Sequence, residues 1–329
     1  MRAMSRRALL LAISAAPAAP RLAQAQSDFP NRPLRIIVPF LPGGGLDLLA
    51  RQMAEPMRAA LGQPVVVENR AGAAGQIGTQ AVARAAPDGY TLLLATAGEI
   101  AVAPPLYGDR LSYDPLRDLA PVTLAARIPN VLVVGPQVPA RSVGELLALA
   151  RANPDQLSFA TGGVGNIQHL NGEMMNRIAG VRTVHVPYRG TAAAITDVAA
   201  GRVTMHFAGA AGMLPLIQEG RLRPLAVTSR TRLPSMPDLP AMAEDPALAG
   251  YELENWFGLL TTGGTPEPVV ARLNAVATAA LRSAELASRM LEQGSIPAPM
   301  APAEFRRFIE AEIAKLGTIV REARITPEG

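Results

Sequence analysis

The chain has 329 residues, of which 49% are hydrophobic, with 31 basic residues, 27 acidic residues and no cysteine. This length can hold two domains with a core each, and the lack of cysteine excludes disulfides, thiolate metal sites and a cysteine nucleophile. There is no basic stripe with interleaved aromatic residues, so we expect no nucleic-acid partner.

The first 25 residues have the pattern of an export signal. Arginines precede the apolar run 8–16, and Ala23-Gln24-Ala25 supplies small residues for cleavage. The apolar run is too short to span a bilayer. The segment carries four of the basic residues and no acidic one, so the chain that remains is close to neutral. We expect cleavage after about Ala25 and a periplasmic location. The pair Arg6-Arg7 leaves both general secretion and twin-arginine export open.

From residue 26 onward, apolar runs of strand length alternate with amphipathic helical patterns, which is typical of an α/β fold with largely parallel sheets. The expected strands are 34–38, 65–67, 91–95, 131–134, 157–160, 184–186, 203–207, 224–228 and 256–260. Proline-rich connections at 129–139 and 233–246 flank a central block. We therefore expect one domain made of 26–128 together with 230–329 and a second made of 129–229, with two chain crossings between them.

Two of these strands lead into glycine turns that are followed by helices. Gly43-Gly44-Gly45 follows the first strand and precedes a helix expected over 46–61. Thr161-Gly162-Gly163-Val164-Gly165 follows the strand at 157–160 and precedes a helix that should end at Gly180. The first N–H groups of a helix lack partners and lie at its positive end, so they can hold a carboxylate or phosphate. Two such turns suggest an anion held between two domains; the alternative is that the glycines only permit tight turns.

Neither turn matches a nucleotide-binding loop. A P-loop ends in Gly-Lys-Ser/Thr, but the only lysine is Lys315, and a dinucleotide turn needs a further glycine where this chain has Leu48 and Gln168. The three histidines have no metal-ligand spacing, and no Gly-x-Ser-x-Gly turn occurs. We therefore expect no cofactor, no metal and no catalytic residue, and a periplasmic hydrolase is the weaker alternative.

Several segments in chain order resemble the Bug or TctC family, the extracytoplasmic solute receptors of tripartite tricarboxylate transporters. They are PLRIIVPFLPGG at 33–44, VVVENRAGAAGQIG at 65–78, PDGYTLL at 87–93, HVPYRG at 185–190, RLRPLAVT at 221–228 and WFGL at 256–259. The resemblance implies a two-domain, type II periplasmic binding protein with mixed sheets flanked by helices. It implies a monomer that closes on a small organic carboxylate and delivers it to integral-membrane transporter subunits. A ligand sensor that feeds a two-component system stays open, because the same closed surface could serve it.

The resemblance also implies the ligand-binding residues, which hold the carboxylate chiefly through backbone N–H groups and ordered waters at the two turns. Carried over by position, they are Pro42, Gly43, Gly44 and Asp47 at the first turn, Thr161, Gly162, Gly163 and Gly165 at the second, and Thr96 and Tyr188 beside the cleft. Asp47 would repel a carboxylate unless water or backbone donors intervene, and capping the first helical turn is an equal alternative. Thr161 either donates to the ligand or caps its own helix. Tyr188 has packing as its alternative role.

The chain departs from the family pattern at three places near the expected cleft. Ala208 stands where many relatives have an aspartate, Ala103 stands where asparagine is frequent, and Glu99 introduces a charge after the third strand. If Glu99 lines the site, we predict a preference for ligands with a distal hydroxyl or amine over a second carboxylate. Because glutamate side chains are mostly exposed, we expect instead a solvated loop charge.

Overall fold

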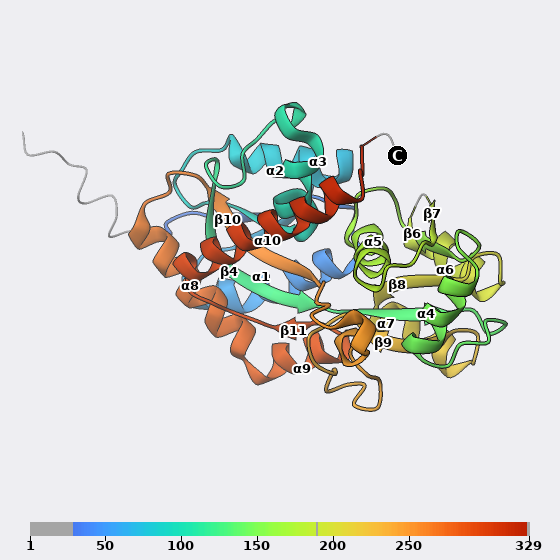
Figure 1. Cartoon of the computed structure of the whole chain (residues 1–329). Helices are drawn as coiled ribbons and strands as arrows, with labels where there is room; N and C mark the ends of the chain where they lie inside the picture. Colours follow the sequence, from blue (N-terminus) through green and yellow to red (C-terminus); the bar gives the residue numbers. More distant parts are fainter. Residues whose placement is uncertain (1–28, 189, 328–329) are drawn as a thin grey trace, which may run out of the picture.

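Two sheets form two lobes that lie side by side (Figure 1). The structure is a computed structural model and describes residues 29–188 and 190–327. The expected export signal, 1–25, lies outside the described residues. In the part of the chain that is described, no helix has the length and apolar character needed to cross a membrane.

The first sheet has six strands in the order β11-β4-β10-β3-β1-β2. They are β1 Leu34–Val38, β2 Val65–Asn69, β3 Thr91–Thr96, β4 Leu119–Ile128, β10 Asn255–Thr262 and β11 Ile296–Pro297. Strand β1 is parallel to both β2 and β3, whereas β10 is antiparallel to β3 and β4, and β11 is antiparallel to β4.

The second sheet has five strands in the order β7-β6-β8-β5-β9. They are β5 Asn130–Val134, β6 Ser158–Thr161, β7 Val184–Pro187, β8 Met205–Gly209 and β9 Arg223–Val227. Strand β6 is parallel to β7 and β8, and β5 is antiparallel to β8 and β9.

All nine expected strands are present, each within two residues of the expected bounds. The two-domain fold with mixed sheets flanked by helices, which the family resemblance implied, is confirmed. The expectation of largely parallel sheets, which came from the alternation of strands and helices, was wrong, because β5 and β10 each enter a sheet from the other lobe and run against their neighbours. Strands β4 and β11 were not expected from the sequence. Pro121 and the alanines of β4 weaken its strand pattern, yet β4 pairs with β10 along nearly its full length.

Helices cover both faces of each sheet. They are α1 Gly45–Leu61, α2 Gln76–Ala83, α3 Ala103–Tyr107, α4 Val143–Ala152, α5 Ile167–Ala179, α6 Thr191–Ala199, α7 Ala210–Gln218, α8 Glu267–Arg282, α9 Ala284–Glu292 and α10 Pro302–Glu322. Short helical turns lie at Ala73–Gly75, Gly98–Val102, Gly108–Arg110, Met242–Glu244 and Pro246–Leu248. The expected end of α5 is confirmed, because Gly180 adopts a left-handed conformation (φ 62°) that closes the helix.

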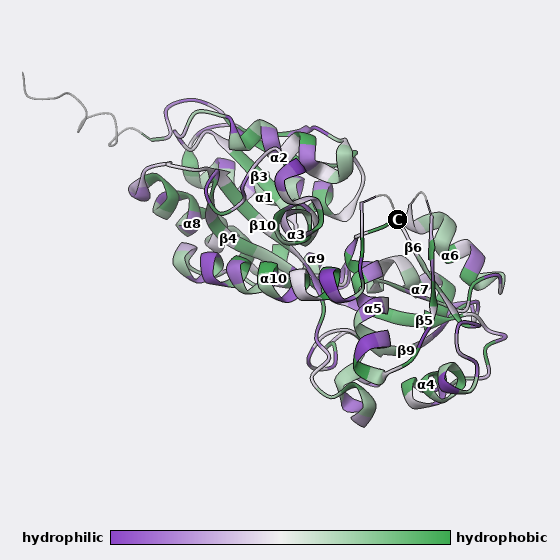
Figure 2. Cartoon of the chain, turned by 45° about the horizontal axis from the view of Figure 1, so that its top comes forward, coloured by the Kyte–Doolittle hydropathy of each residue, from purple (hydrophilic) through white to green (hydrophobic). Residues whose placement is uncertain are grey.

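The core of the first lobe has a layer on each side of its sheet. Helices α1 and α8 contact one face, and α2 and α10 contact the other. The apolar stripe of α1 is buried against the sheet and consists of Leu46, Leu49, Met53, Met57 and Leu61. Each such side chain contributes about 1.5–3 kcal/mol when fully buried. Figure 2 shows the apolar strands in green inside both lobes.

The chain passes between the lobes twice, from β4 to β5 and from β9 to β10. Helix α10 of the first lobe also contacts α5 of the second, where Arg177 Nε lies 3.3 Å from Glu322 Oε2 (Figure 1). The strands of the first sheet lie in 34–128 and 255–297, and those of the second lie in 130–227. We propose that the two sheets are the cores of the discontinuous and the central domain, 26–128 with 230–329 and 129–229.

Candidate functional site

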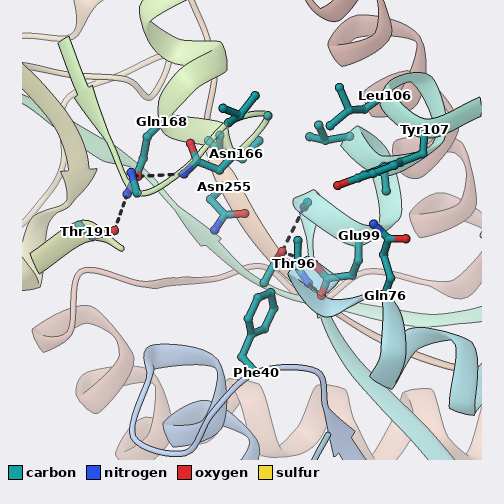
Figure 3. A pocket seen from close by; sticks show the side chains of 18 of the residues that line it. Phe40, Gln76, Thr96, Glu99, Leu106, Tyr107, Asn166, Gln168, Thr191 and Asn255 are labelled. Atoms are coloured by element: carbon teal, nitrogen blue, oxygen red, sulfur yellow. Dashed lines mark hydrogen bonds between the residues drawn. The ribbon is translucent and has the colours of Figure 1, made fainter. Parts of the chain in front are cut away.

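A cavity of about 240 Å³ lies between the two lobes. The first lobe contributes the segments after β1, β2 and β3, and the second contributes the turn after β6 and the start of α6 (Figure 3). Asn130 and Asn255, the first residues of β5 and β10, lie where the chain crosses between lobes and also line the cavity. Loops at the carboxyl ends of parallel strands are the usual place for a ligand in such sheets.

The glycine turn after β6 forms one wall of the cavity. Three backbone N–H groups of this turn donate hydrogen bonds to side chains of the same lobe. Gly162 N donates to Gln168 Oε1 at 2.9 Å, and Gln168 Nε2 donates to Thr191 Oγ1 at 3.2 Å. Gly163 N donates to Thr161 Oγ1 at 3.3 Å, and Gly165 N donates to His169 Nδ1 at 3.1 Å. The turn is therefore held from behind by side chains of β6 and α5, with its amides oriented by local acceptors.

Two histidines support this turn from the core. The rings of His169 and His185 stack with centroids 3.6 Å apart, and Phe159 stacks on His185 at 5.1 Å. Thr161 Oγ1 donates to Gly163 O and lies 2.7 Å from His185 Nε2. Burial, together with the neighbouring His169, lowers the pKa of His185 to about 4, so His185 is neutral at neutral pH. The Thr161 hydroxyl is thus used inside its own turn.

Two glycines of this turn have no room for a side chain. A Cβ added at Gly162 would lie 2.9 Å from Thr191 Oγ1. A Cβ at Gly165, which has φ +72°, would lie 2.6 Å from Leu106 Cδ2. Because Leu106 belongs to α3 in the first lobe, the second glycine turn is also a place where the two lobes lie in close contact at the cavity wall.

The first glycine turn lies exposed at the rim, and its acidic residue faces the turn itself. Asp47 Oδ2 accepts hydrogen bonds from Gly43 N and Arg51 Nε, both at 3.0 Å, and Oδ1 accepts one from Asn69 Nδ2 at 3.0 Å. Burial opposes ionisation of Asp47, but the hydrogen bonds from Arg51, Gly43 and Asn69 outweigh it and hold its pKa below the usual value. Asp47 therefore ties the glycine turn to the start of α1, but it does not cap the helix, because the N-cap is Gly44 and has no side-chain cap hydrogen bond.

Thr96 and Glu99 form the floor of the cavity after β3. Glu99 Oε1 accepts from Thr96 N at 2.7 Å, and Glu99 Oε2 accepts from Thr96 Oγ1 at 2.5 Å. The expectation of a solvated loop charge was wrong, because the Glu99 side chain is 0% exposed. The single π-helical turn Gly98–Val102 directs it inward. Burial raises the pKa of Glu99 to about 7, although the hydrogen bonds from Thr96 oppose this rise.

The structure brings only some of the expected site residues to the cavity. Thr96, Gly162 and Gly165 line it. The other expected residues are not among its lining: Pro42, Gly43, Gly44, Asp47, Thr161, Gly163 and Tyr188. Tyr188 instead donates its hydroxyl proton to Asp197 Oδ2 at 2.7 Å. Pro42, Gly43 and Gly44 are exposed at the rim beside Phe40, which does line the cavity.

Sequence reasoning missed several polar lining residues, namely Gln76, Asn130, Asn166, Gln168, Thr191 and Asn255. The sequence could have indicated Asn130 and Asn255, because each is a polar residue at the start of an apolar strand that follows a crossing between the lobes. The Nδ2 atom of Asn130 is buried and has no hydrogen-bond partner among the described residues. It is therefore a donor available to a molecule in the cavity.

No basic side chain lines the cavity among the described residues, and Glu99 is the only carboxylic acid there. Within 29–188 and 190–327, no group of three or more acidic and histidine side chains could hold a metal ion. An anion in this cavity would be held by uncharged donors, namely main-chain N–H groups and the amides of Asn130 and Asn255. Neutral donors that are oriented in advance can bind a carboxylate in a low-dielectric site.

The chain is similar to known proteins over most of its length. The family model described as tripartite tricarboxylate transporter family receptor matches residues 49–325. Among curated relatives, the UPF0065 protein in the tcbD-tcbE intergenic region of Pseudomonas sp. strain P51 is 38% identical over 303 residues, 92% of this chain and 90% of the relative. Protein BugT of Bordetella pertussis is 37% identical over 298 residues, 89% of this chain and 90% of BugT.

Solved structures are similar over about nine-tenths of the chain. R. palustris Rpa4515 with adipate has a TM-score of 0.80 and 36% identity, and the match covers 91% of this chain and 99% of that one. MatC (Rpa3494) from Rhodopseudomonas palustris with bound malate has a TM-score of 0.75 and 32% identity, with 89% of this chain and 100% of that chain covered.

Proposed function

This chain belongs to the family of tripartite tricarboxylate transporter receptors, and from that premise we propose that it captures a small organic carboxylate between its lobes and delivers it to integral-membrane transporter subunits. Members of the family are periplasmic solute-binding receptors, not enzymes. We further propose that residues 1–25 direct export, by either secretion route, and that the receptor acts as a monomer. Adipate and malate in the two similar structures support a carboxylate as the class of ligand.

The observation that carries the proposal is the set of uncharged donors around the cavity. Asn130 Nδ2 has no partner among the described residues, and Gly162 and Gly165, whose N–H groups donate to Gln168 and His169 in this structure, line the cavity. The Gly162 N–H is held by the neutral Gln168 Oε1. A ligand carboxylate that replaces this acceptor makes a charge-assisted hydrogen bond, which is roughly twice as strong as a neutral one.

Lobe closure supplies the second half of the site in this proposal. The first glycine turn has φ +90° at Gly43 and open space around it, and the adjacent Leu41 is 73% exposed. Closing the lobes on a ligand would cover this turn and Leu41. Such contacts exist only in the closed form, and only contacts of that kind let a ligand shift the equilibrium toward closure.

Carboxylate binding by glycine variants of the two turns tests the proposed site. We would measure binding of linear mono- and dicarboxylates to the purified receptor by calorimetry, with neutral sugars and cations as non-cognate controls. Gly43→Ala and Gly163→Ala both place a methyl group at a positive φ with no atom within 4 Å, so each perturbs only the backbone of its turn. Gly220→Ala, at φ +69° and also in open space, is the matched control outside the cavity.

Each turn variant should weaken carboxylate binding by roughly tenfold to a hundredfold, the equivalent of one charge-assisted hydrogen bond. Gly220→Ala should change only stability. A receptor that responds to no carboxylate but binds sugars or cations would overturn the proposed function. Delivery is tested separately, because uptake of the bound carboxylate by cells should require both this receptor and the membrane subunits.

A further inference from the structure

The Thr96 hydroxyl has only one hydrogen to donate, and Glu99 takes it. Thr96 Oγ1 donates to Glu99 Oε2 at 2.5 Å and accepts from Gly98 N at 3.1 Å. Thr96 lines the cavity and is partly exposed, whereas the Glu99 carboxylate behind it is fully buried. A hydroxyl has one donor and two acceptor sites. What Thr96 presents to the cavity is therefore its remaining lone pair.

Among residues 29–188 and 190–327, no cation compensates the charge of Glu99. Its carboxyl group packs against Gly75, where an added Cβ would lie 3.4 Å from Cδ and 3.2 Å from Phe40 Cζ. Tyr113 donates to the main-chain oxygen of Glu99 at 2.7 Å and carries no charge, since burial raises its pKa. Tyr107 is the other titratable group among the described lining residues. An ionised Glu99 therefore projects an unbalanced negative potential into this end of the cavity.

Both features favour the same ligand chemistry. A lone pair on Thr96 accepts a hydrogen bond from a hydroxyl or ammonium group and repels a carboxylate oxygen. The buried charge of Glu99 adds like-charge repulsion against a second carboxylate, which discriminates strongly in a low-dielectric site.

We propose that the Thr96–Glu99 pair makes this receptor selective for a monocarboxylate whose far end carries a hydroxyl or ammonium group, and that it rejects the dicarboxylate of the same length. This inference rests on the proposed function, because it assigns the far end of a ligand whose near carboxylate the glycine turns hold. Glu99 is a positioning residue that sets which way the Thr96 hydroxyl points, and Thr96 makes the contact.

Protonation of Glu99 should relax the selectivity. A neutral carboxyl group can donate to Thr96 Oγ1, which frees the Thr96 hydrogen for an acceptor on the ligand and removes the repulsive charge. Because the pKa of Glu99 is about 7, the group is largely neutral at pH 6 and largely ionised at pH 8.5. Glu99→Gln imitates the neutral form at both values, since its amide can donate to Thr96 Oγ1 while its oxygen accepts from Thr96 N.

Calorimetry with matched ligand pairs tests the proposal. The probes are 4-hydroxybutyrate against succinate and 6-hydroxyhexanoate against adipate, with butyrate and hexanoate as references, each at pH 6 and pH 8.5. At pH 8.5 we expect the hydroxy acid of the better-fitting pair to bind at least ~tenfold more tightly than its dicarboxylate. The ratio should fall severalfold at pH 6, and in Glu99→Gln it should be small at both pH values.

Three variants separate selectivity from folding. Thr96→Ser keeps the hydroxyl and should keep the ratio, whereas Thr96→Val should abolish the advantage of the hydroxy acid over the unsubstituted acid. Glu310→Gln removes an exposed charge on α10 and should change nothing. A dicarboxylate that binds wild type at pH 8.5 as well as the hydroxy acid does, or a ratio unchanged in Glu99→Gln, would overturn the inference while the proposed function stands. A flat response to every carboxylate would overturn both.

Discussion

Replacing Glu99 by glutamine should stabilise the protein at alkaline pH far more than at acidic pH. Burial raises the pKa of Glu99 from the ordinary 4.5 to about 7, so the folded protein binds this proton more tightly than the unfolded chain does. The stability that this proton contributes is fully present below pH 4.5 and is lost as pH rises to 7. Each tenfold change in acidity corresponds to about 1.4 kcal/mol, so the ionised side chain lowers the free energy of unfolding by about 3 kcal/mol above pH 7.

Glutamine never ionises, so Glu99→Gln does not lose this stability. For a chain of this size, a gain of about 3 kcal/mol corresponds to a rise in Tm of roughly 6 °C. We would compare the Tm of wild type and variant at pH 5 and pH 9 without added ligand, because any isosteric effect of the amide appears at both values and cancels in the difference. Glu310→Gln serves as the control for a lost surface charge.

A Tm difference between wild type and Glu99→Gln that is the same at pH 5 and pH 9 would contradict this prediction. A wild type that is more stable than Glu99→Gln at pH 9 would contradict it as well. Either result would mean that Glu99 ionises in the folded state as readily as in the unfolded chain, and that its buried position carries no unbalanced charge.

Three further changes probe the core. Burial lowers the pKa of His206 to about 4, so its neutral form contributes stability that is present above pH 6.5 and is lost as pH falls toward 4. The urea midpoint of wild type should therefore fall relative to that of His206→Leu on acidification, and a constant difference between the two midpoints would contradict the shift. Tyr251→Phe removes the donor to Asn171 Oδ1 (2.6 Å) and should lower the free energy of unfolding by about 1–3 kcal/mol in urea titrations; a neutral result would show that water replaces it. Gly258→Ala places a Cβ 2.3 Å from Phe305 Cζ and should cost about 1–3 kcal/mol, with part of the loss recovered by Phe305→Leu; additive effects of the two changes would contradict the clash.

Local patterns in the sequence predicted most of the framework. The strands before both glycine turns, the apolar stripe of α1 and the end of α5 at Gly180 are all found where they were expected. Strand β4 was missed because Pro121 and several alanines hide its pattern, while its strand pairing with β10 comes from residues more than 100 positions later in the chain. Pairing across such distances overrides local propensity and cannot be read from one segment.

The chain by itself determined the family, the alternation of strands and helices and the position of both glycine turns, because each depends on the spacing of residues within a single segment. Tertiary structure alone decided what those turns face and what completes the cavity. In the folded chain, Asp47 accepts hydrogen bonds from Gly43 and Arg51, and the Glu99 side chain is buried beside Thr96. Asn130 and Asn255 both line the cavity where the chain crosses between the lobes. These outcomes depend on which distant segments pack together, since burial and hydrogen-bond partners are set by neighbours that sequence spacing does not specify.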